Sequence, residues 1–533
     1  MGSKSRGPWS CDEGGRNMKR RSFLQTAGAS ALMIGGGVKA AGAAVPTHNW
    51  DGHDFGPGPA VKDRLYQGPF PQYAPEAFIA GSEVVMTTTP SREIVPNFGM
   101  GLTVYVSGDY WPPRTKNDSL EAYCEKLIEL PFAQKVYIRL NWRDIHKRRG
   151  KLEFPEGWKV TFDLARRYGK RVGFRIMLEN PDYPQPGMPE FLIGKVPYVK
   201  PRGEWNRGPS HIRKDYSMPR YDHPEYQAAF RELNALLAAE LNGNPLVEYM
   251  DTMMYGFWGE GHTWPFEGNP FPDNRVAEQT FVAMFEAQRE VWSRTPLVTN
   301  TQPDWSMVGN SELLDRSIRT GNWLRTDTIF IENEQIEALS NRPPWVAAVS
   351  EVGMTRADPK SLRIAEGVTY TENVIQHVID IGANYWSLWH WHDIDARNIL
   401  EYYEKYPEHI DLIARRIGYR IRPSWIWQTE KDGYPGLVIG FVNDGVACVP
   451  GVLRVTVSND DGRVQATGCL DPGYPLTRGV RQALFMLPRG TKWNGLRLRA
   501  ELEVKGARYA VRWACQQELN EDGSLTLRPN LAA

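Results

Sequence analysis

Cysteine is scarce in this sequence, with only five among 533 residues. None of the five has the CxxC spacing of a structural zinc site, so we expect no such site. Cys448, Cys469 and Cys515 all lie near the C-terminal end. One disulfide among these three is compatible with the sequence, but spacing alone does not establish it.

An excess of charge of either sign is also absent. Lys and Arg total 63, as do Asp and Glu, which gives a formal net charge of zero. Nucleic-acid and anionic-membrane partners both favour a basic excess, so we expect neither partner. No GxGxxG or Walker motif follows any predicted strand, and we expect no cofactor.

Long hydrophobic runs are missing except near the N-terminus. Residues 18–44 combine Lys19-Arg20-Arg21, a short apolar stretch and small residues near Ala41–Ala44. This is the three-part pattern of an export signal, and Arg20-Arg21-Ser22-Phe23-Leu24 resembles the twin-arginine motif. The sequence therefore predicts a periplasmic or extracellular protein with no membrane anchor after cleavage, and residues 1–17 form an extension upstream of the signal.

Alternating strand and helix patterns occupy the middle of the chain. Short β-rich apolar runs are separated by amphipathic stretches, of which Pro224–Leu241 is a clear helix that stops at Asn242-Gly243. The eight predicted strands are Leu102–Ser107, Val136–Asn141, Val172–Leu178, Tyr249–Phe257, Leu297–Thr301, Thr328–Glu332, Val346–Ser350 and Asn384–Trp389. Nearly continuous apolar strands of this number predict a (β/α)8 barrel, with a doubly wound open sheet as the alternative.

The remaining segments complete a four-part organisation. We expect the export signal over 1–44, an irregular lead-in rich in Pro and Gly over 45–96, the barrel over 97–417 and a β-sandwich over 418–533. The last part contains short alternating strands separated by turns such as Asn459-Asp460-Asp461-Gly462. Residues 181–222 should form a long functional loop at the C-terminal face of the barrel.

Polar and aromatic residues gather where the predicted strands end. In a (β/α)8 barrel these positions carry the reacting groups. The candidate substrate-binding residues are Arg139, Asn141, Arg175, Trp258, His262, Asn300, Glu332, Trp389, His390 and Trp391. Aromatic faces stack on sugar rings and polar edges bond their hydroxyls, so the set predicts a carbohydrate substrate.

Two carboxylates stand out within this group. Glu260 follows the fourth predicted strand in a run of Gly, Phe and Trp, and Glu351 ends the seventh. Hydrolysis of a glycosidic bond requires a proton for the leaving oxygen and a nucleophile or an activated water for the anomeric carbon, and two carboxyl groups supply both. This hypothesis requires both side chains to face one pocket that a sugar linkage can reach.

The arrangement resembles that of clan A retaining glycoside hydrolases, which carry one glutamate after strand four and another after strand seven. The resemblance implies that Glu260 is the acid/base and Glu351 the nucleophile, with Arg139 contacting the nucleophile and Trp389 or Trp391 beneath the sugar. The stretch from Tyr137 to Asp144 is similar to the second-strand region of family 42 β-galactosidases. The stretch from Tyr255 to His262 resembles barrel proteins that carry a C-terminal β-sandwich. Most clan members place Asn before the strand-four glutamate, whereas this chain has Gly259.

Some alternatives remain open on the sequence. Glu332, with Glu334 behind it, competes for the role of nucleophile, and Glu179 is a further candidate acid. A Trp-lined, partly apolar setting would raise the pKa of Glu260. A polysaccharide lyase, a non-catalytic carbohydrate-binding barrel and a metal-dependent hydrolase using His262, His390 or His392 are the rival functions. The sugar, the linkage and the oligomeric state are not predicted.

Overall fold

The structure is a computed structural model. It describes residues 83–106, 119–183, 186–203, 212, 214–301, 307–326, 333–351, 370–388, 396–470 and 480–530. The predicted export signal and most of the predicted lead-in lie outside these residues.

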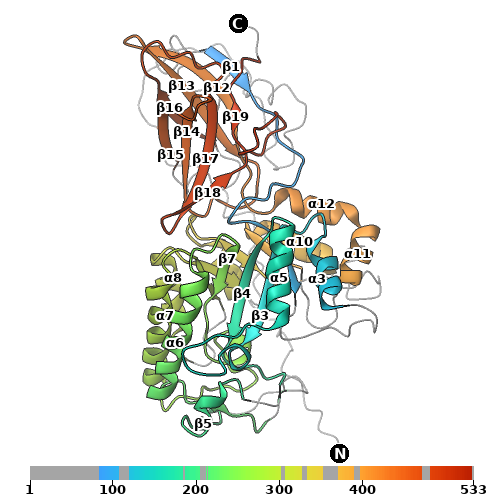
Figure 1. The fold of residues 1–533 in the computed structure, drawn as a ribbon, viewed down its shortest axis with the longest axis vertical. Helices are drawn as coiled ribbons and strands as arrows, with labels where there is room; N and C mark the ends of the chain where they lie inside the picture. The colour runs from blue at the N-terminus through green and yellow to red at the C-terminus, as the bar shows by residue number, and fades with distance from the viewer. Residues whose placement is uncertain are drawn as a thin grey trace, which may run out of the picture. The chain divides into compact units, whose positions relative to one another are not determined.

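Eight parallel strands close into a barrel (Figure 1). In chain order they are β2 (Gly101–Val106), β3 (Lys135–Asn141), β4 (Arg171–Met177), β7 (Val247–Asp251), β8 (Leu297–Asn300), β9 (Trp323–Thr326), β10 (Ala348–Ser350) and β11 (Tyr385–Ser387). Each strand pairs with the next, and β11 pairs with β2 to complete the ring. The predicted (β/α)8 barrel is therefore confirmed, and the open-sheet alternative is wrong.

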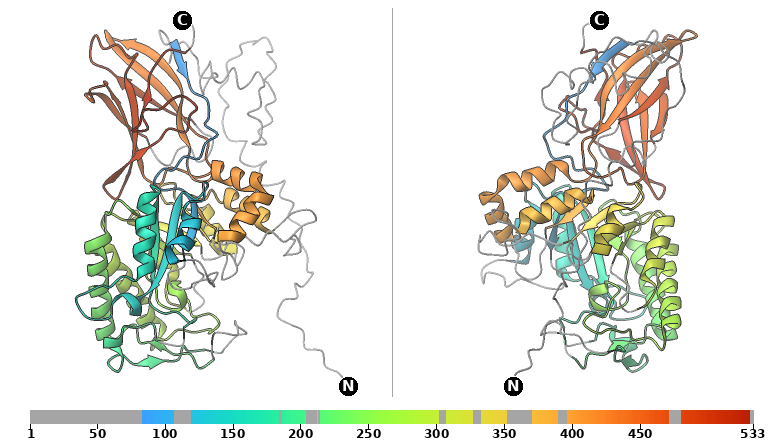
Figure 2. Two further views of the ribbon diagram at one scale, coloured as in Figure 1. Left: turned by 45° about the vertical axis from the view of Figure 1, so that its right-hand side comes forward. Right: turned by 180° about the vertical axis from the view of Figure 1, so that it is seen from behind.

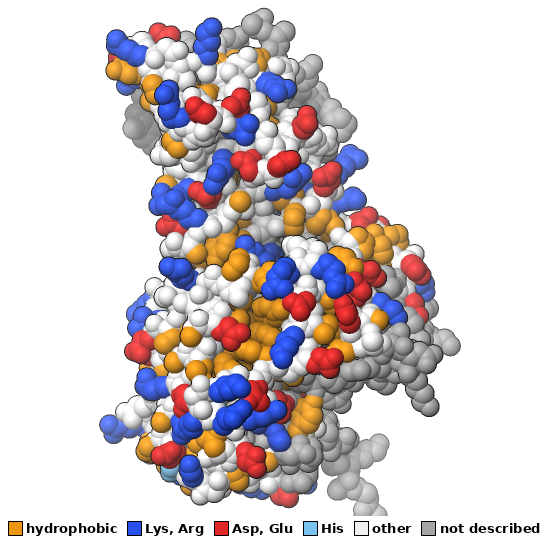
Figure 3. Space-filling model, in the orientation of Figure 1, with side chains coloured by type: hydrophobic (Ala, Val, Ile, Leu, Met, Phe, Trp, Pro, Cys, Tyr) orange, Lys and Arg blue, Asp and Glu red, His pale blue; other side chains and the backbone are white. Residues whose placement is uncertain are grey.

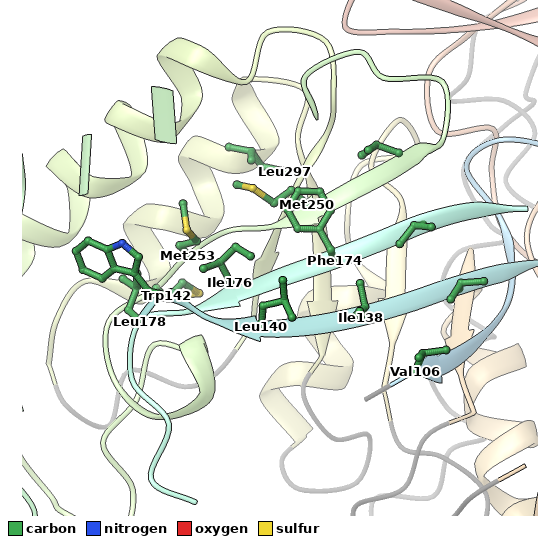
Figure 4. Packing of buried hydrophobic residues seen from close by; sticks show 14 of the residues in the cluster. Val106, Ile138, Leu140, Trp142, Phe174, Ile176, Leu178, Met250, Met253 and Leu297 are labelled. Carbon is green, nitrogen blue, oxygen red and sulfur yellow. The ribbon is translucent and has the colours of Figure 1, made fainter. Parts of the chain in front are cut away.

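Side chains alternate between the two faces of each barrel strand, as the period of two in a β-strand requires. On β3 and β4, Ile138, Leu140, Phe174 and Ile176 belong to the apolar layer between the strands and the helices, as Figure 4 shows. The intervening positions include Tyr137, Arg139 and Arg175, which are buried as well. A barrel interior with three buried arginines (Arg139, Arg175 and Arg325) must also contain their counter-charges.

Helices follow the strands and cover the outside of the barrel, where α6, α7 and α8 lie side by side (Figures 1 and 2). The α-helices are α3 (Leu120–Ile128), α4 (Trp142–Ile145), α5 (Glu156–Arg167), α6 (Pro224–Leu241), α7 (Asn274–Val291), α8 (Asn310–Arg319), α9 (Asn333–Ser340), α10 (Tyr370–Asp380), α11 (Ala396–Lys405) and α12 (Pro407–Arg416). The helix α6 has the bounds that the sequence predicts. Pro224 begins it, as suits a residue without an amide hydrogen.

Two antiparallel sheets form the C-terminal part. One has the order β1-β12-β13-β16, and the other β15-β14-β17-β18 with β19 paired to β17. The strands are β1 (Glu83–Thr87), β12 (Ile421–Lys431), β13 (Tyr434–Asn443), β14 (Val452–Ser458), β15 (Val464–Leu470), β16 (Val480–Met486), β17 (Arg497–Val504), β18 (Ala507–Val511) and β19 (Leu525–Thr526). Side chains from both sheets pack in one core, which confirms the predicted sandwich. The expectation of an irregular lead-in is wrong for Glu83–Thr87, which pairs with β12.

Two barrel strands differ from their predicted ranges by more than two residues. The fourth strand ends at Asp251 rather than Phe257, and the sixth is Trp323–Thr326, ahead of the predicted Thr328–Glu332. Apolar runs are the strongest strand signal in a sequence. The observed sixth strand contains the charged Arg325, so its signal is weaker than that of the predicted range. All of the predicted sixth strand lies outside the described residues.

The surface drawn in Figure 3 carries Lys and Arg interspersed with Asp and Glu, and neither sign dominates there. Among the described residues, no helix is both long and apolar enough to cross a bilayer. Cys448, Cys469 and Cys515 are free thiols, so the possible disulfide is not formed.

Candidate active site

Glu260 lies in a tight turn beyond the end of β7. Gly256, Gly259 and Gly261 all have positive φ, and so does Trp258, at 50°. A Cβ on Gly256 would lie 2.0 Å from the carbonyl oxygen of His262, which accepts a hydrogen bond from the Phe257 amide. The turn therefore requires glycine at 256, and it returns the chain so that Glu260 faces the barrel interior.

Two buried arginines surround the Glu260 carboxylate. Arg175 Nη1 donates to its Oε1 at 2.7 Å, and Arg139 Nη1 forms an ion pair with the same oxygen at 3.9 Å. The glutamate side chain is itself buried, with a residue exposure of 3%. Because neighbouring guanidinium groups favour the ionised carboxylate, this setting differs from the partly apolar one that the sequence led us to expect. Trp258 instead donates its indole N–H to Asp182 at 2.9 Å.

His262 also contacts the Glu260 carboxylate. The Trp264 amide lies 3.2 Å from His262 Nδ1, and because an amide N–H only donates, Nδ1 accepts. The ring proton is therefore assigned to Nε2, which lies 3.2 Å from Glu260 Oε2 and donates to it. This neutral tautomer positions the carboxylate.

Glu351 follows β10 directly, as predicted, and is also buried. Its Oε2 pairs with Nη2 of Arg325 on β9. The resemblance implied Arg139 as the partner of this carboxylate. The structure instead pairs Arg139 with Glu260, and Arg325, which the sequence had not singled out, with Glu351.

Asp251, also missed by the sequence analysis, joins the two halves of the site. Its Oδ2 accepts from Arg175 Nε at 2.9 Å, from Tyr137 OH at 2.5 Å and from Arg325 Nη1. A continuous path of contacts therefore runs from Glu260 through Arg175, Asp251 and Arg325 to Glu351. The available sequence signal was an acidic residue directly after Tyr249 and Met250, but the overlong predicted strand obscured it.

The other predicted site residues have various positions. Asn141 Nδ2 donates to Asp144, and its Oδ1 accepts from Asn180. Asn300, at the end of β8, donates to the carbonyl oxygen of Glu260 at 3.0 Å and so helps to hold the turn. Glu332, Trp389, His390 and Trp391 lie outside the described residues, as does the side chain of Glu334.

Glu179 is a further buried carboxyl group at this end of the barrel, two residues after β4. Its Oε1 accepts from Tyr216 OH at 2.6 Å and from the Gly187 amide at 3.0 Å. Burial raises the pKa of Glu179 to about 7, although both hydrogen bonds oppose that shift. Tyr216 belongs to the predicted 181–222 loop, which contains a small antiparallel pair, β5 (Tyr198–Val199) and β6 (Met218–Pro219).

Metal ligands are a further question for this set of side chains. The described residues contain no group of three or more His, Cys, Asp and Glu side chains able to hold an ion. Both ring nitrogens of His262 are occupied by the contacts above. The ionisable groups that the structure does bring together are therefore carboxylates and guanidinium groups.

No family model matches the chain, and no curated protein sequence matches it either. Solved structures resemble the chain only at low sequence identity and low TM-score. A β-galactosidase from the psychrophilic Marinomonas ef1 matches at 12% identity and a TM-score of 0.36, over 59% of each chain. Endo-glycoceramidase II from Rhodococcus sp. matches at 11% identity and a TM-score of 0.37, over 75% of this chain and all of that one. A family 39 glycoside hydrolase from Bacteroides cellulosilyticus WH2 matches at 10% identity and a TM-score of 0.36, over 74% of this chain and 82% of that one. At these values the likeness assigns neither an activity nor a substrate.

Proposed function

We propose that the chain is a glycoside hydrolase that cleaves an oligo- or polysaccharide with retention of configuration. The observation that carries this proposal is the contact path that connects Glu260 to Glu351 within one barrel interior. Glu351, paired with Arg325, is the nucleophile, because attack on the anomeric carbon requires an ionised carboxylate. Glu260 is the acid/base.

Protonation of the leaving oxygen by Glu260 depends on its contact with Arg175. Glu260 must hold a proton to protonate the leaving oxygen, whereas its contacts with Arg175 and Arg139 favour the ionised form. Arg175 also binds Asp251, which can retain the guanidinium when Glu260 releases it. Substrate binding must therefore separate Glu260 from Arg175 before the glycosidic bond is broken.

A screen of aryl glycosides tests the activity, with Glu260→Gln and Glu351→Gln in parallel. We expect Glu260→Gln to lower kcat/KM by about 10²–10⁴-fold on substrates with poor leaving groups, and by less on activated ones, which need little protonation. A 2-fluoroglycoside should trap a covalent adduct on Glu351 in the wild type and none in Glu351→Gln. Full turnover by both variants would refute the assignment.

A second candidate is a non-catalytic carbohydrate-binding barrel. The burial and arginine pairing of both carboxylates favour it, since a reacting group must reach its substrate. Calorimetry of oligosaccharide binding separates the two functions. Binding without turnover, unchanged in Glu260→Gln and Glu351→Gln, identifies the binding protein.

We also propose export by the twin-arginine route, on the sequence of residues 18–44 alone. Replacing Arg20 and Arg21 together by lysine conserves the positive charge and removes the motif. The wild-type chain should reach the periplasm or medium and the variant should stay in the cytoplasm. Equal export of both would contradict this route.

A further inference from the structure

Asp251 has an unusual position in the site, between the arginines of both proposed catalytic carboxylates. Arg175 donates Nε to Asp251 and Nη1 to Glu260, while Arg325 contacts Asp251 through Nη1 and Glu351 through Nη2. Each guanidinium group is therefore divided between Asp251 and one glutamate. A change at Asp251 must alter the charge that both glutamates experience.

The cluster is balanced in charge within the described residues. Its arginines are Arg139, Arg175 and Arg325, and its carboxylates are Asp251, Glu260 and Glu351. The other ionisable groups that face it are Tyr105 on β2, Tyr137 on β3, Tyr249 on β7 and His262 in the turn. Burial raises the pKa of both Tyr137 and Tyr249, so these phenols stay neutral.

Because the cluster is buried, each of its charges has a strong effect on the others. Asp251 and Arg325 are 1% and 2% exposed, and charges that are shielded from water interact strongly. Although burial opposes the charge on Arg325, the adjacent Asp251 helps to raise its pKa above the ordinary arginine value. These arginines therefore remain cationic, and the protons that can move in the cluster are not theirs.

We propose that Asp251 is a positioning residue that shares Arg175 and Arg325 with Glu260 and Glu351, and thereby sets the pH range in which the pair works. This inference rests on the proposed glycosidase function for its catalytic consequence. Without Asp251, the three arginines would act on one fewer carboxylate among the described residues. Both glutamates would then hold a proton less readily.

The variant Asp251→Asn tests this, because it keeps the side-chain shape and removes one negative charge. In a retaining glycosidase the acid limb of the pH–rate profile reports ionisation of the nucleophile, and the basic limb reports loss of the acid's proton. We expect both limbs to move to lower pH by on the order of one unit. A lower kcat with both limbs in place would overturn the proposal, since that result indicates a purely structural aspartate.

Two further variants serve as controls. Tyr137→Phe removes a neutral donor from the same Oδ2 oxygen, so the limbs should stay in place. Asp251→Glu keeps the charge and displaces it, so kcat should fall while the limbs again stay. A shift of the limbs in either control as large as that in Asp251→Asn would also overturn the proposal.

Thermal unfolding of Asp251→Asn, Arg325→Met and the double variant provides a test that does not need activity. If Asp251 shares Arg325, the Tm of the double variant should fall by less than the sum of the decreases in the two single variants. Additive losses would overturn the sharing. If the wild type cleaves no glycoside while the losses are non-additive, the proposed function fails and the charge sharing stands.

Discussion

The stability of this protein should depend on pH through Glu179. Its side chain is 1% exposed, Oε1 accepts two hydrogen bonds, and Oε2 has no hydrogen-bond partner among the described residues. Burial raises the pKa of this carboxyl from 4.5 to about 7. The difference corresponds to about 3 kcal/mol of folding free energy.

The sign follows from proton binding. Between about pH 4.5 and pH 7 the folded protein retains a proton on Glu179 that the unfolded chain releases. The stabilising contribution is therefore fully present below the unfolded pKa, and it is lost as the pH rises through the folded pKa. The wild type should lose about 3 kcal/mol from this group across that window.

Glu179→Gln removes this dependence, because glutamine resembles the protonated acid at every pH. Below about pH 4.5 the variant should match the wild type or fall slightly below it, since its buried amide lacks an acceptor. Across the window its Tm should rise relative to the wild type by on the order of 5 °C. Scanning fluorimetry from pH 4.5 to pH 8 measures this difference directly.

The matched control is Glu190→Gln, which changes an exposed glutamate in the same insertion. Its Tm difference from the wild type should be independent of pH. Tyr216→Phe removes a hydrogen bond that favours the ionised form of Glu179, and it should extend the window to higher pH. A Glu179→Gln difference that is the same at pH 5 and pH 8 would refute the reasoning.

Other perturbations test the turn and the closure of the barrel. Gly256→Ala should displace the Glu260 turn by about 1 Å and lower kcat/KM by about 10²-fold. The control is Gly321→Ala, because Gly321 also has a positive φ but a Cβ there would meet no atom within 4 Å. Equal decreases in kcat/KM for both variants would contradict the proposed clash at Gly256. Asn384→Ala should cost about 2–5 kcal/mol in chemical denaturation, because it leaves the Ala348 amide and the carbonyl groups of Gly99 and Cys448 unpaired. The control is Asn341→Ala, which changes an exposed asparagine. A similar loss of unfolding free energy in that variant would show that the hydrogen bonds of Asn384 do not stabilise the barrel.

Much of the fold follows from local patterns. Strands such as Val136–Asn141 and Val172–Leu178 were predictable because a parallel strand inside a barrel requires apolar side chains toward the helices. The prediction failed at Trp323–Thr326, where Arg325 interrupts the apolar run. From a sequence alone an arginine is expected at the surface, because the partners that would allow its burial are not known.

The candidate site was predicted in part. Glu351 follows its strand as expected, and Glu260, Arg139 and Arg175 do meet in one cluster. The partners were wrong or missing. Asp251 was overlooked, Arg139 pairs with Glu260, and Arg325 is the partner of Glu351. These pairings depend on which strands become neighbours, and spacing along the chain carries no information on that.

The sequence by itself determined the barrel, the C-terminal β-domain and the residue types at the strand ends, because hydrophobic periodicity and turn residues act over short distances along the chain. Only the tertiary structure decided how three arginines are divided among Asp251, Glu260 and Glu351. The contacts of Arg175 and Arg325 with Asp251 join residues more than 70 positions apart. Barrel closure brings them together, and a buried charge is tolerated only where an opposite charge meets it.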